Sequence, residues 1–132
     1  MYQTGEEVDE CFAIHGPIHA ELGIAMDMAI VMKSSSGSIC TLSLSFNNDG
    51  PLGSSFRYIC DHGTYLARNY DLFDGKDEQI DVSSVDVSMN GIELVDREFF
   101  AAIKEEREPN GSIAQCLPAM RVLDRIEKQL SF

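Results

Sequence analysis

The spacing of apolar residues changes once along this chain, and that change limits the folds it can form. In the first two-thirds of the sequence, apolar residues alternate with small or polar ones, a period of two that is typical of β-strands. In the last third they recur every three or four residues, as along one face of a helix. Strands followed by helices are typical of an α+β domain.

The clearest alternation predicts an antiparallel hairpin. It covers Ile24–Met32 and Cys40–Phe46, on either side of a Ser34–Gly37 turn. One face of this hairpin carries Met, Ile, Leu and Phe, and the other carries Ala, Asp, Thr and Ser. We expect the bulky face to lie under helices. The small-residue face is expected to meet solvent or the flat sheet of a neighbouring protomer.

Other strands are predicted before and after this hairpin. Val8–His15 is a first strand that ends at Gly16–Pro17, and a second hairpin joins Phe56–Cys60 to Thr64–Arg68. The acidic stretch Asp71–Asp86 is expected to hold one or two short edge strands. Because the sequence shows no internal repeat and no low-complexity linker, residues 1–132 are predicted to form a single domain.

Two amphipathic helices are predicted at the C-terminal end. Asn90 caps the first, with Glu93 as its reciprocal partner, and Ser112 with Gln115 repeats this pattern for the second. The expected apolar stripes are Ile92, Val95, Phe99 and Ala102/Ile103 in the first helix, and Ile113, Cys116/Leu117, Met120, Leu123, Ile126 and Leu130 in the second. Pro118 predicts a kink or a late start in the second helix.

Charge and cysteine content restrict the partners and the compartment. Twenty-two acidic and ten basic residues give a net charge of −12, which opposes binding to nucleic acid or to an anionic membrane. The four cysteines have no C-x-x-C spacing, so we expect buried free thiols. Since the chain shows no leader and no apolar run that could span a membrane, a cytoplasmic location is expected.

No complete active site is recognisable in the sequence. The glycines nowhere form a G-x-G-x-x-G or G-x-x-x-x-G-K-[ST] loop, so this chain alone is not expected to hold a dinucleotide. No nucleophile elbow and no Cys–His pair stand out, and we assign no catalytic residue. His15 and His19 lack a third ligand, so no metal site is assigned either.

Five polar residues are candidate substrate contacts, each with an ordinary structural alternative. His15 and His19 flank a Gly-Pro-Ile turn and serve either as substrate contacts or as plain surface histidines. Asn47 and Asn48 close the second strand of the first hairpin and either bind substrate or cap the backbone. Arg57 either binds a substrate carboxylate or forms a salt bridge with Asp27 or another acid of the sheet.

Several segments, in this order, resemble one enzyme family. Ile24–Ala29 and Gly37–Phe46 are similar to a central hairpin, Asp61–Leu66 is similar to a glycine-containing turn, and Arg97–Ile103 resembles an R-E-x-x-D-F-x-x-A-I helix signature. The family is the glucose–fructose oxidoreductase, inositol dehydrogenase and rhizopine catabolism (Gfo/Idh/MocA) group. Within it, Gly16–Gly23 and Phe46–Gly53 are similar to the carboxy-hydroxymuconate semialdehyde dehydrogenases.

The resemblance implies a fold and a role. Family enzymes join an N-terminal Rossmann domain to a C-terminal domain with an open, mainly antiparallel β-sheet and two C-terminal helices packed on one face (dihydrodipicolinate reductase-like). The second domain supplies substrate contacts and usually the oligomer interface. This chain is therefore expected to be that C-terminal substrate-binding domain, self-associating as a homodimer or higher oligomer. NAD or NADP is implied only for the full-length enzyme.

The resemblance also gives the candidate residues a ligand. His15, His19, Asn47, Asn48 and Arg57 would contact a small carboxylated, sugar-like or cyclic hemiacetal substrate. The cofactor fingerprint of the family has no counterpart in this chain, so activity of the chain alone is not expected. Two other hypotheses stay open: a stand-alone binding or dimerisation module without redox function, and an enzyme completed by a separate nucleotide-binding chain.

Overall fold

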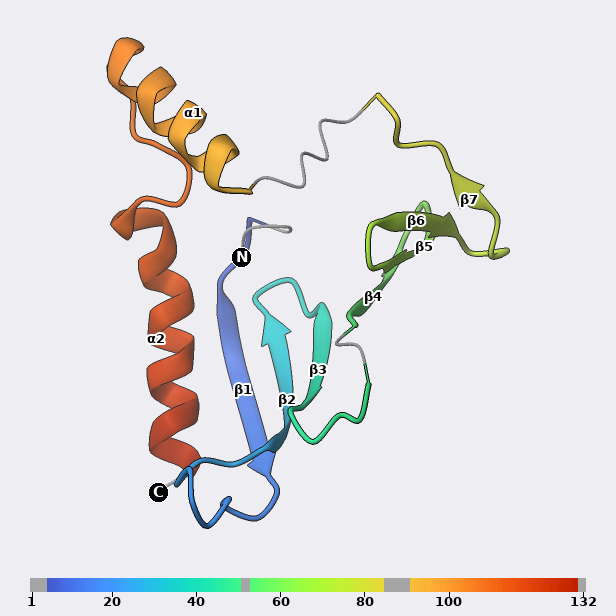
Figure 1. Cartoon of the computed structure of the whole chain (residues 1–132), viewed down its shortest axis with the longest axis vertical. Coiled ribbons are helices and arrows are strands. Elements are labelled where there is room, and N and C mark those ends of the chain that lie inside the picture. The colour runs from blue at the N-terminus through green and yellow to red at the C-terminus, as the bar shows by residue number, and fades with distance from the viewer. Residues whose placement is uncertain (1–4, 51–52, 85–90, 131–132) are drawn as a thin grey trace. The chain divides into compact units, whose positions relative to one another are not determined.

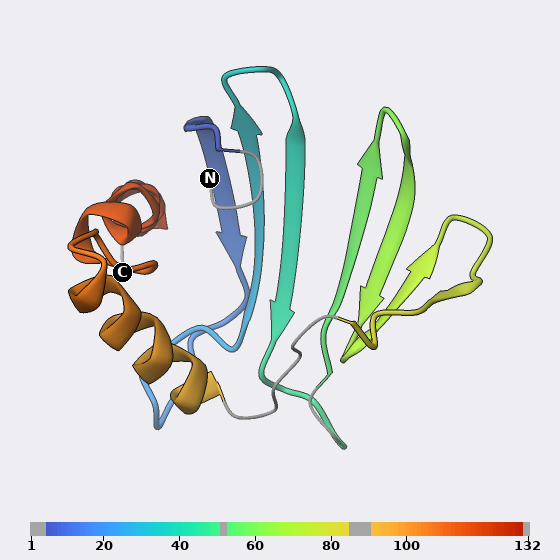
Figure 2. The same cartoon turned by 90° about the horizontal axis from the view of Figure 1, so that it is seen from above.

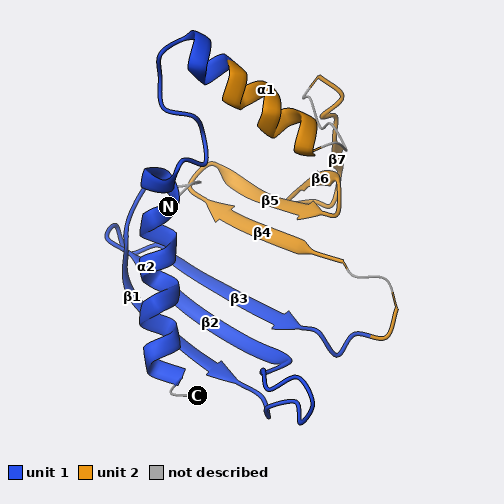
Figure 3. Ribbon diagram, turned by 60° about the vertical axis from the view of Figure 1, so that its left-hand side comes forward, with its two compact units in different colours: residues 1–48, 101–132 blue, residues 49–100 orange. Residues whose placement is uncertain are grey.

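A computed structural model describes residues 5–50, 53–84 and 91–130 of the chain. The chain divides into two compact units (Figure 3). The first unit contains residues 1–48 and 101–132, and the second contains residues 49–100. The prediction that residues 1–132 form a single domain stays a prediction.

The described residues form two antiparallel sheets and two helices (Figure 1). The strands and helices are β1 (Val8–His15), β2 (Asp27–Ser34), β3 (Ile39–Ser45), β4 (Ser55–Cys60), β5 (Gly63–Arg68), β6 (Asp71–Asp74), β7 (Gln79–Ile80), α1 (Gly91–Lys104) and α2 (Ile113–Leu130). One sheet has the order β1-β2-β3 and the other has the order β4-β5-β6-β7. The predicted α+β class is confirmed.

The first unit contains the hairpin that the alternation predicted. β2 and β3 pair antiparallel, and the amide N–H of Gly37 donates to the carbonyl of Ser34 at 2.9 Å to close their turn. Gly37 has a φ of 93°, a left-handed conformation that glycine adopts without a steric penalty. β1 pairs with the other edge of β2, and its bounds match the predicted first strand.

The core of the first unit lies between its sheet and α2. α2 runs along β1 in Figure 1 and lies beside it in Figure 2. The buried residues Ala13, Ile30, Val122 and Ile126 meet between the helix and the sheet. Half-buried Met28, Met32 and Leu42 pack around this cluster. The bulky face of the hairpin therefore lies under a helix, as the sequence predicted.

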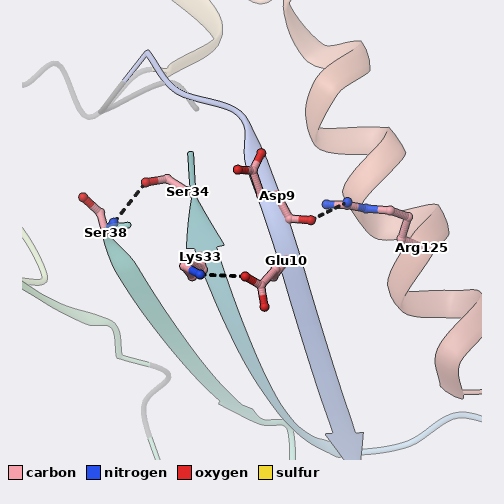
Figure 4. A network of polar contacts seen from close by, with 6 residues as sticks. All are labelled: Asp9, Glu10, Lys33, Ser34, Ser38 and Arg125. Atoms are coloured by element: carbon pink, nitrogen blue, oxygen red, sulfur yellow. Dashed lines mark hydrogen bonds and ion pairs between the residues drawn. The ribbon is translucent and has the colours of Figure 1, made fainter. Parts of the chain in front are cut away.

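Side chains from α2 also fasten the helix to the backbone of β1. The Arg125 guanidinium donates to the carbonyl of Val8 at 2.6 Å. It also donates to the carbonyl of Asp9 at 3.1 Å (Figure 4). Farther along the helix, the Gln129 amide donates to the carbonyl of Cys11 at 2.9 Å. These bonds join residues more than a hundred positions apart. They attach the last helix of the chain to its first strand within the same unit.

The buried face of α2 differs from the predicted stripe. Val122, Ile126 and Leu130 face the sheet at i, i+4 and i+8, and Val122 was not in the prediction. Five members of the predicted stripe are exposed: Ile113, Cys116, Leu117, Met120 and Leu123. Apolar residues surround much of this helix, so the periodicity alone could not show which stripe meets the sheet.

The start of α2 follows the predicted capping pattern. The amide N–H of Gln115 donates to the Ser112 hydroxyl at 3.2 Å, and the Gln115 side chain accepts from the amide N–H of Gly111 at 3.1 Å. Because the helix begins at Ile113, Pro118 lies inside it and a late start is excluded.

In α1, Glu93 and Arg97 form an i,i+4 ion pair. The predicted cap, Asn90, lies outside the described residues. Within the predicted apolar stripe of α1 only Ala102 is buried, whereas Ile92, Val95, Phe99 and Ile103 are more than half exposed. A periodic pattern shows which residues share a face but not whether anything covers that face.

The second unit is built from local hairpins. β4 and β5 pair around Asp61–Gly63, and β5, β6 and β7 follow as a meander, which confirms the second hairpin and the short edge strands. The Asp74 carboxylate accepts from the amide N–H groups of Lys76 and Glu78, at 2.8 and 2.9 Å, in the β6–β7 turn. None of the residues described in this unit is buried.

The cysteine prediction is correct in one respect and wrong in another. All four thiols are free, but Cys40, Cys60 and Cys116 are exposed and Cys11 is only half-buried. Cys40 lies on β3, an edge strand, and Cys116 lies in the first turn of α2, where its thiol donates to the carbonyl of Gly111 at 3.4 Å. No helix among the residues that the structure describes is long and apolar enough to cross a membrane.

Candidate functional site

Three strand ends meet at one end of the first sheet. His15 is the last residue of β1, Asp27 is the first of β2, and Ser45 is the last of β3. His15 pairs in register with Met28, the residue after Asp27, and Asp27 pairs directly with Ser45. This strand-end site therefore combines polar side chains from all three strands of the unit.

The Asp27 carboxylate is the centre of the hydrogen bonding there. It accepts from the Ser45 hydroxyl at 2.6 Å and from the Asn47 side-chain amide at 2.8 Å. The Ser45 hydroxyl oxygen in turn accepts from the backbone N–H of Asn47 at 3.2 Å. Both oxygens of Asp27 are thus engaged, and Asn47 is fixed through its backbone and its side chain.

Gly16 holds the end of β1 close to the same aspartate. Its amide N–H donates to the backbone carbonyl of Asp27 at 2.9 Å. A Cβ added at Gly16 would lie 3.2 Å from the Cβ of Asp27, which leaves no comfortable room for a side chain. Next to it, His15 Nδ1 lies 2.6 Å from the carbonyl of Gly16 and must donate to it, because a carbonyl oxygen can only accept.

His19 shapes the loop that connects β1 to β2. Its Nδ1 accepts from the backbone N–H groups of Glu21 and Leu22, both at 3.3 Å. An accepting Nδ1 requires the neutral ring with the proton on Nε2. His19 is therefore a loop-stabilising residue that presents an Nε2–H donor at an exposed position.

The structure brings some of the five predicted contacts together. His15 and Asn47 both lie around Asp27, and the exposed Asn48 follows Asn47 in the chain. The expectation of backbone capping is not met at Asn47, whose side chain bonds a carboxylate instead. Arg57 is exposed on β4 in the second unit and forms no ion pair with the acids described in that unit.

Asp27 and Ser45 were not among the predicted site residues. The sequence does hold a signal for Asp27, because it is an acid between two methionines at the start of an otherwise apolar strand. Ser45 was hidden, since it belongs to a regular alternation of Thr and Ser along the edge strand. Only the register that pairs the two residues shows that they form one network.

An ion pair on the first sheet shifts the pKa values of both its members. A hydrogen bond from Lys33 to Glu10, 2.6 Å long, lowers the pKa of the Glu10 carboxyl and raises the pKa of Lys33 (Figure 4). Glu10 lies near the start of β1, whereas His15 ends that strand. This pair therefore belongs to the sheet surface and not to the candidate site.

Among the described residues, the candidate site residues belong to no group of metal ligands and line neither of the two hollows below. Across residues 5–50, 53–84 and 91–130, no three His, Cys, Asp or Glu side chains are grouped as metal ligands. A cleft of about 220 Å³ lies beside the start of β1, lined by Val8, Arg121 and Arg125 among others. A second, open hollow of about 410 Å³ follows Gln79–Ser83. No candidate residue lines either one.

Comparisons with known proteins identify the family of this chain. The family of bacterial oxidoreductases, C-terminal, matches residues 1–86. The chain is also 66% identical over 129 residues to a 4-carboxy-2-hydroxymuconate-6-semialdehyde dehydrogenase from Sphingobium sp. (strain NBRC 103272 / SYK-6). That match covers 98% of this chain but 41% of the relative's length. The chain therefore belongs to the C-terminal domain family of bacterial oxidoreductases, in agreement with the Gfo/Idh/MocA resemblance.

Proposed function

We propose that this chain is the substrate-binding and self-associating part of an NAD(P)-dependent dehydrogenase that acts on a small carboxylated semialdehyde. The observation that carries this proposal is the strand-end site. There the Asp27 side chain accepts a hydrogen bond from Asn47, and the Asp27 backbone carbonyl accepts one from Gly16, the neighbour of His15. The similarity to the Sphingobium dehydrogenase supports the substrate class. The candidate contacts are His15, His19, Asn47 and Asn48, with Arg57 as a cation in the second unit.

These residues suit such a substrate chemically. A hydroxymuconate semialdehyde bearing a carboxyl group offers carboxylate oxygens, a hydroxyl group and an aldehyde. The Nε2–H that His19 presents is a donor for a carboxylate or aldehyde oxygen. The Arg57 guanidinium can bind a carboxylate through two parallel N–H···O bonds.

The dinucleotide of the reaction does not suit the residues of this chain. The sequence has no G-x-G-x-x-G loop, and every strand pairing described is antiparallel, whereas dinucleotide sites are built on parallel βαβ units. We therefore assign NAD or NADP to other residues of a full-length enzyme and no catalytic residue to this chain. By the same proposal, the chain alone is inactive.

Self-association is proposed through the face of the first sheet opposite α2. The hairpin gives this face Ala29, Thr41 and Ser43, as predicted, but β1 adds Phe12 and Ile14, which are 62% and 58% exposed. Phe12 pairs in register with Val31, so the apolar part spans two strands. An apolar sheet face of this kind is suited to a homodimer or higher oligomer.

A chimeric enzyme tests the catalytic part of the proposal. The matched segment of the Sphingobium dehydrogenase is replaced by the corresponding 129 residues of this chain. Oxidation of 4-carboxy-2-hydroxymuconate-6-semialdehyde is then followed by the absorbance of NADH or NADPH. We expect kcat/KM within about tenfold of the parent enzyme. A chimera that is folded and oligomeric but inactive would overturn the proposal and favour a binding module without redox function.

Sedimentation of the 132-residue chain tests self-association. Phe12→Lys places a charge on the proposed interface and should shift a dimer toward a 14.6 kDa monomer. Ile59→Lys is the matched control, because Ile59 is 80% exposed on β4 in the second unit. A monomeric unsubstituted chain at high concentration, or equal dissociation of both variants, would contradict the proposed interface.

A further inference from the structure

The orientation of the Asn47 side chain is fixed by what faces it. Its Nδ2 lies 2.8 Å from Oδ2 of Asp27. An ionised carboxylate only accepts hydrogen bonds, so the NH₂ end of the amide, and not its carbonyl, must face Asp27. The Asn47 carbonyl oxygen, Oδ1, therefore points away from the carboxylate.

The surroundings hold this orientation firmly. The other oxygen of Asp27 accepts from the Ser45 hydroxyl at 2.6 Å, and that hydroxyl oxygen accepts from the backbone N–H of Asn47 at 3.2 Å. The three residues thus form a closed cycle of hydrogen bonds at the ends of β2 and β3. Rotating the amide by half a turn would place two acceptors against each other and break this cycle.

An outward carbonyl beside a carboxylate selects one kind of ligand group. Oδ1 of Asn47 is an acceptor, so it binds a hydroxyl hydrogen and repels a carboxylate oxygen. The negative charge of Asp27, which is hydrogen-bonded to the NH₂ end of the same amide, adds to that repulsion. We propose that Asp27 is a positioning residue that makes Asn47 a hydroxyl-specific substrate contact, and that the substrate carboxylates are bound elsewhere.

This inference rests on the proposed function, and the chemistry of that substrate class fits it. The 2-hydroxyl of a hydroxymuconate semialdehyde either stays free or adds to the C6 aldehyde. In the second case the hydroxyl hydrogen ends on the former aldehyde oxygen, and the C–O bond that forms closes a cyclic hemiacetal. Each form keeps one hydroxyl donor for Asn47.

Two ligands separate hydroxyl recognition from general binding. They are 4-carboxy-2-hydroxymuconate-6-semialdehyde and its analogue without the 2-hydroxyl, 4-carboxymuconate-6-semialdehyde, which has the same carboxylates and cannot form the hemiacetal. Each is titrated into the ¹⁵N-labelled 132-residue chain, and Kd is obtained from amide shifts. The unsubstituted chain should bind the hydroxylated ligand about fivefold more tightly, the value of one net hydrogen bond.

Asp27→Ala should remove most of that preference. Alanine keeps the backbone carbonyl that accepts from the amide N–H of Gly16, so the sheet end is retained. The preference should fall below about twofold, with the analogue bound as well as before or better. Asn47→Ala should give the same loss, and the double variant no further loss. Asp9→Ala, the same change at an exposed position near the other end of the sheet, should keep the preference.

The outcomes distinguish the inference from the function on which it rests. If the unsubstituted chain prefers the hydroxylated ligand and Asp27→Ala keeps that preference, or weakens both ligands equally, the positioning role is wrong. If the unsubstituted chain binds both ligands equally, the hydroxyl contact is wrong while the substrate-binding function stands. If it binds neither ligand, both the contact and the proposed substrate class are overturned.

Discussion

The two compact units of this chain are stabilised in different ways. In the first, a helix near the C-terminus packs on a strand near the N-terminus, and buried residues from both form the core. In the second, each strand pairs with its neighbour in sequence, and no described residue is buried. Long-range packing supports the strand-end site, whereas the second unit relies on local turns. Substitutions should therefore have unequal effects in the two units.

The largest expected effect is a cavity in the core of the first unit. Ile126→Ala removes a side chain that is 5% exposed and should lower the free energy of unfolding by about 3 kcal/mol. Ile59→Ala in β4, where the side chain is 80% exposed, should change it by less than about 0.5 kcal/mol. Urea denaturation followed by circular dichroism measures both. Equal losses would remove the contrast between the units.

The next effect concerns the fastening of α2 to β1. Arg125→Ala loses the hydrogen bonds to the carbonyls of Val8 and Asp9 and should cost about 1–2 kcal/mol. Arg121→Ala, one turn earlier on the same helix, removes the same charge and should cost less than about 0.5 kcal/mol. The same denaturation experiment compares them. An equal cost would show that charge, and not the contact with β1, is what matters.

Two glycine-to-alanine substitutions should differ in their effect on stability. Gly16→Ala places a Cβ 3.2 Å from that of Asp27 and should destabilise the first unit by about 1 kcal/mol. Gly91→Ala, at the start of α1, meets nothing within 4 Å and should be neutral or stabilising by up to about 1 kcal/mol. Melting temperatures of the two variants give the signs, and a stabilising Gly16→Ala would contradict the close approach at the strand ends.

The smallest effect is a pH dependence in the second unit. Hydrogen bonds from the backbone N–H groups of Glu78 and Lys76 lower the pKa of the Asp74 carboxyl below 3.8. A lowered folded pKa gives stability that is complete above the unfolded value and is lost as the pH falls through the folded one. The protection of amides in the β6–β7 turn against hydrogen exchange, expressed relative to the unstructured chain at the same pH, should therefore fall below about pH 4. Asp74→Asn should remove that dependence, and an unchanged pH profile would contradict the assignment.

The sequence predicts local structure better than it predicts which surfaces of the helices are buried. Alternation identified β1 to β5, and the Ser112 and Gln115 pair identified the start of α2, because these signals depend on neighbouring residues. The exposed stripe of α1 and the role of Val122 could not be predicted, since they depend on which surfaces meet. In the site, residue type indicated His15 and Asn47, but their link through Asp27 required the strand register.

The most direct test of the account is a map of where substrate binds. The ¹⁵N-labelled chain is titrated with 4-carboxy-2-hydroxymuconate-6-semialdehyde, and amide shift changes are assigned to residues. We predict that the largest changes lie at the strand ends of the first sheet, around His15, Asp27 and Asn47. Changes confined to β4–β7, to the cleft beside Arg121, or absent throughout would contradict the account.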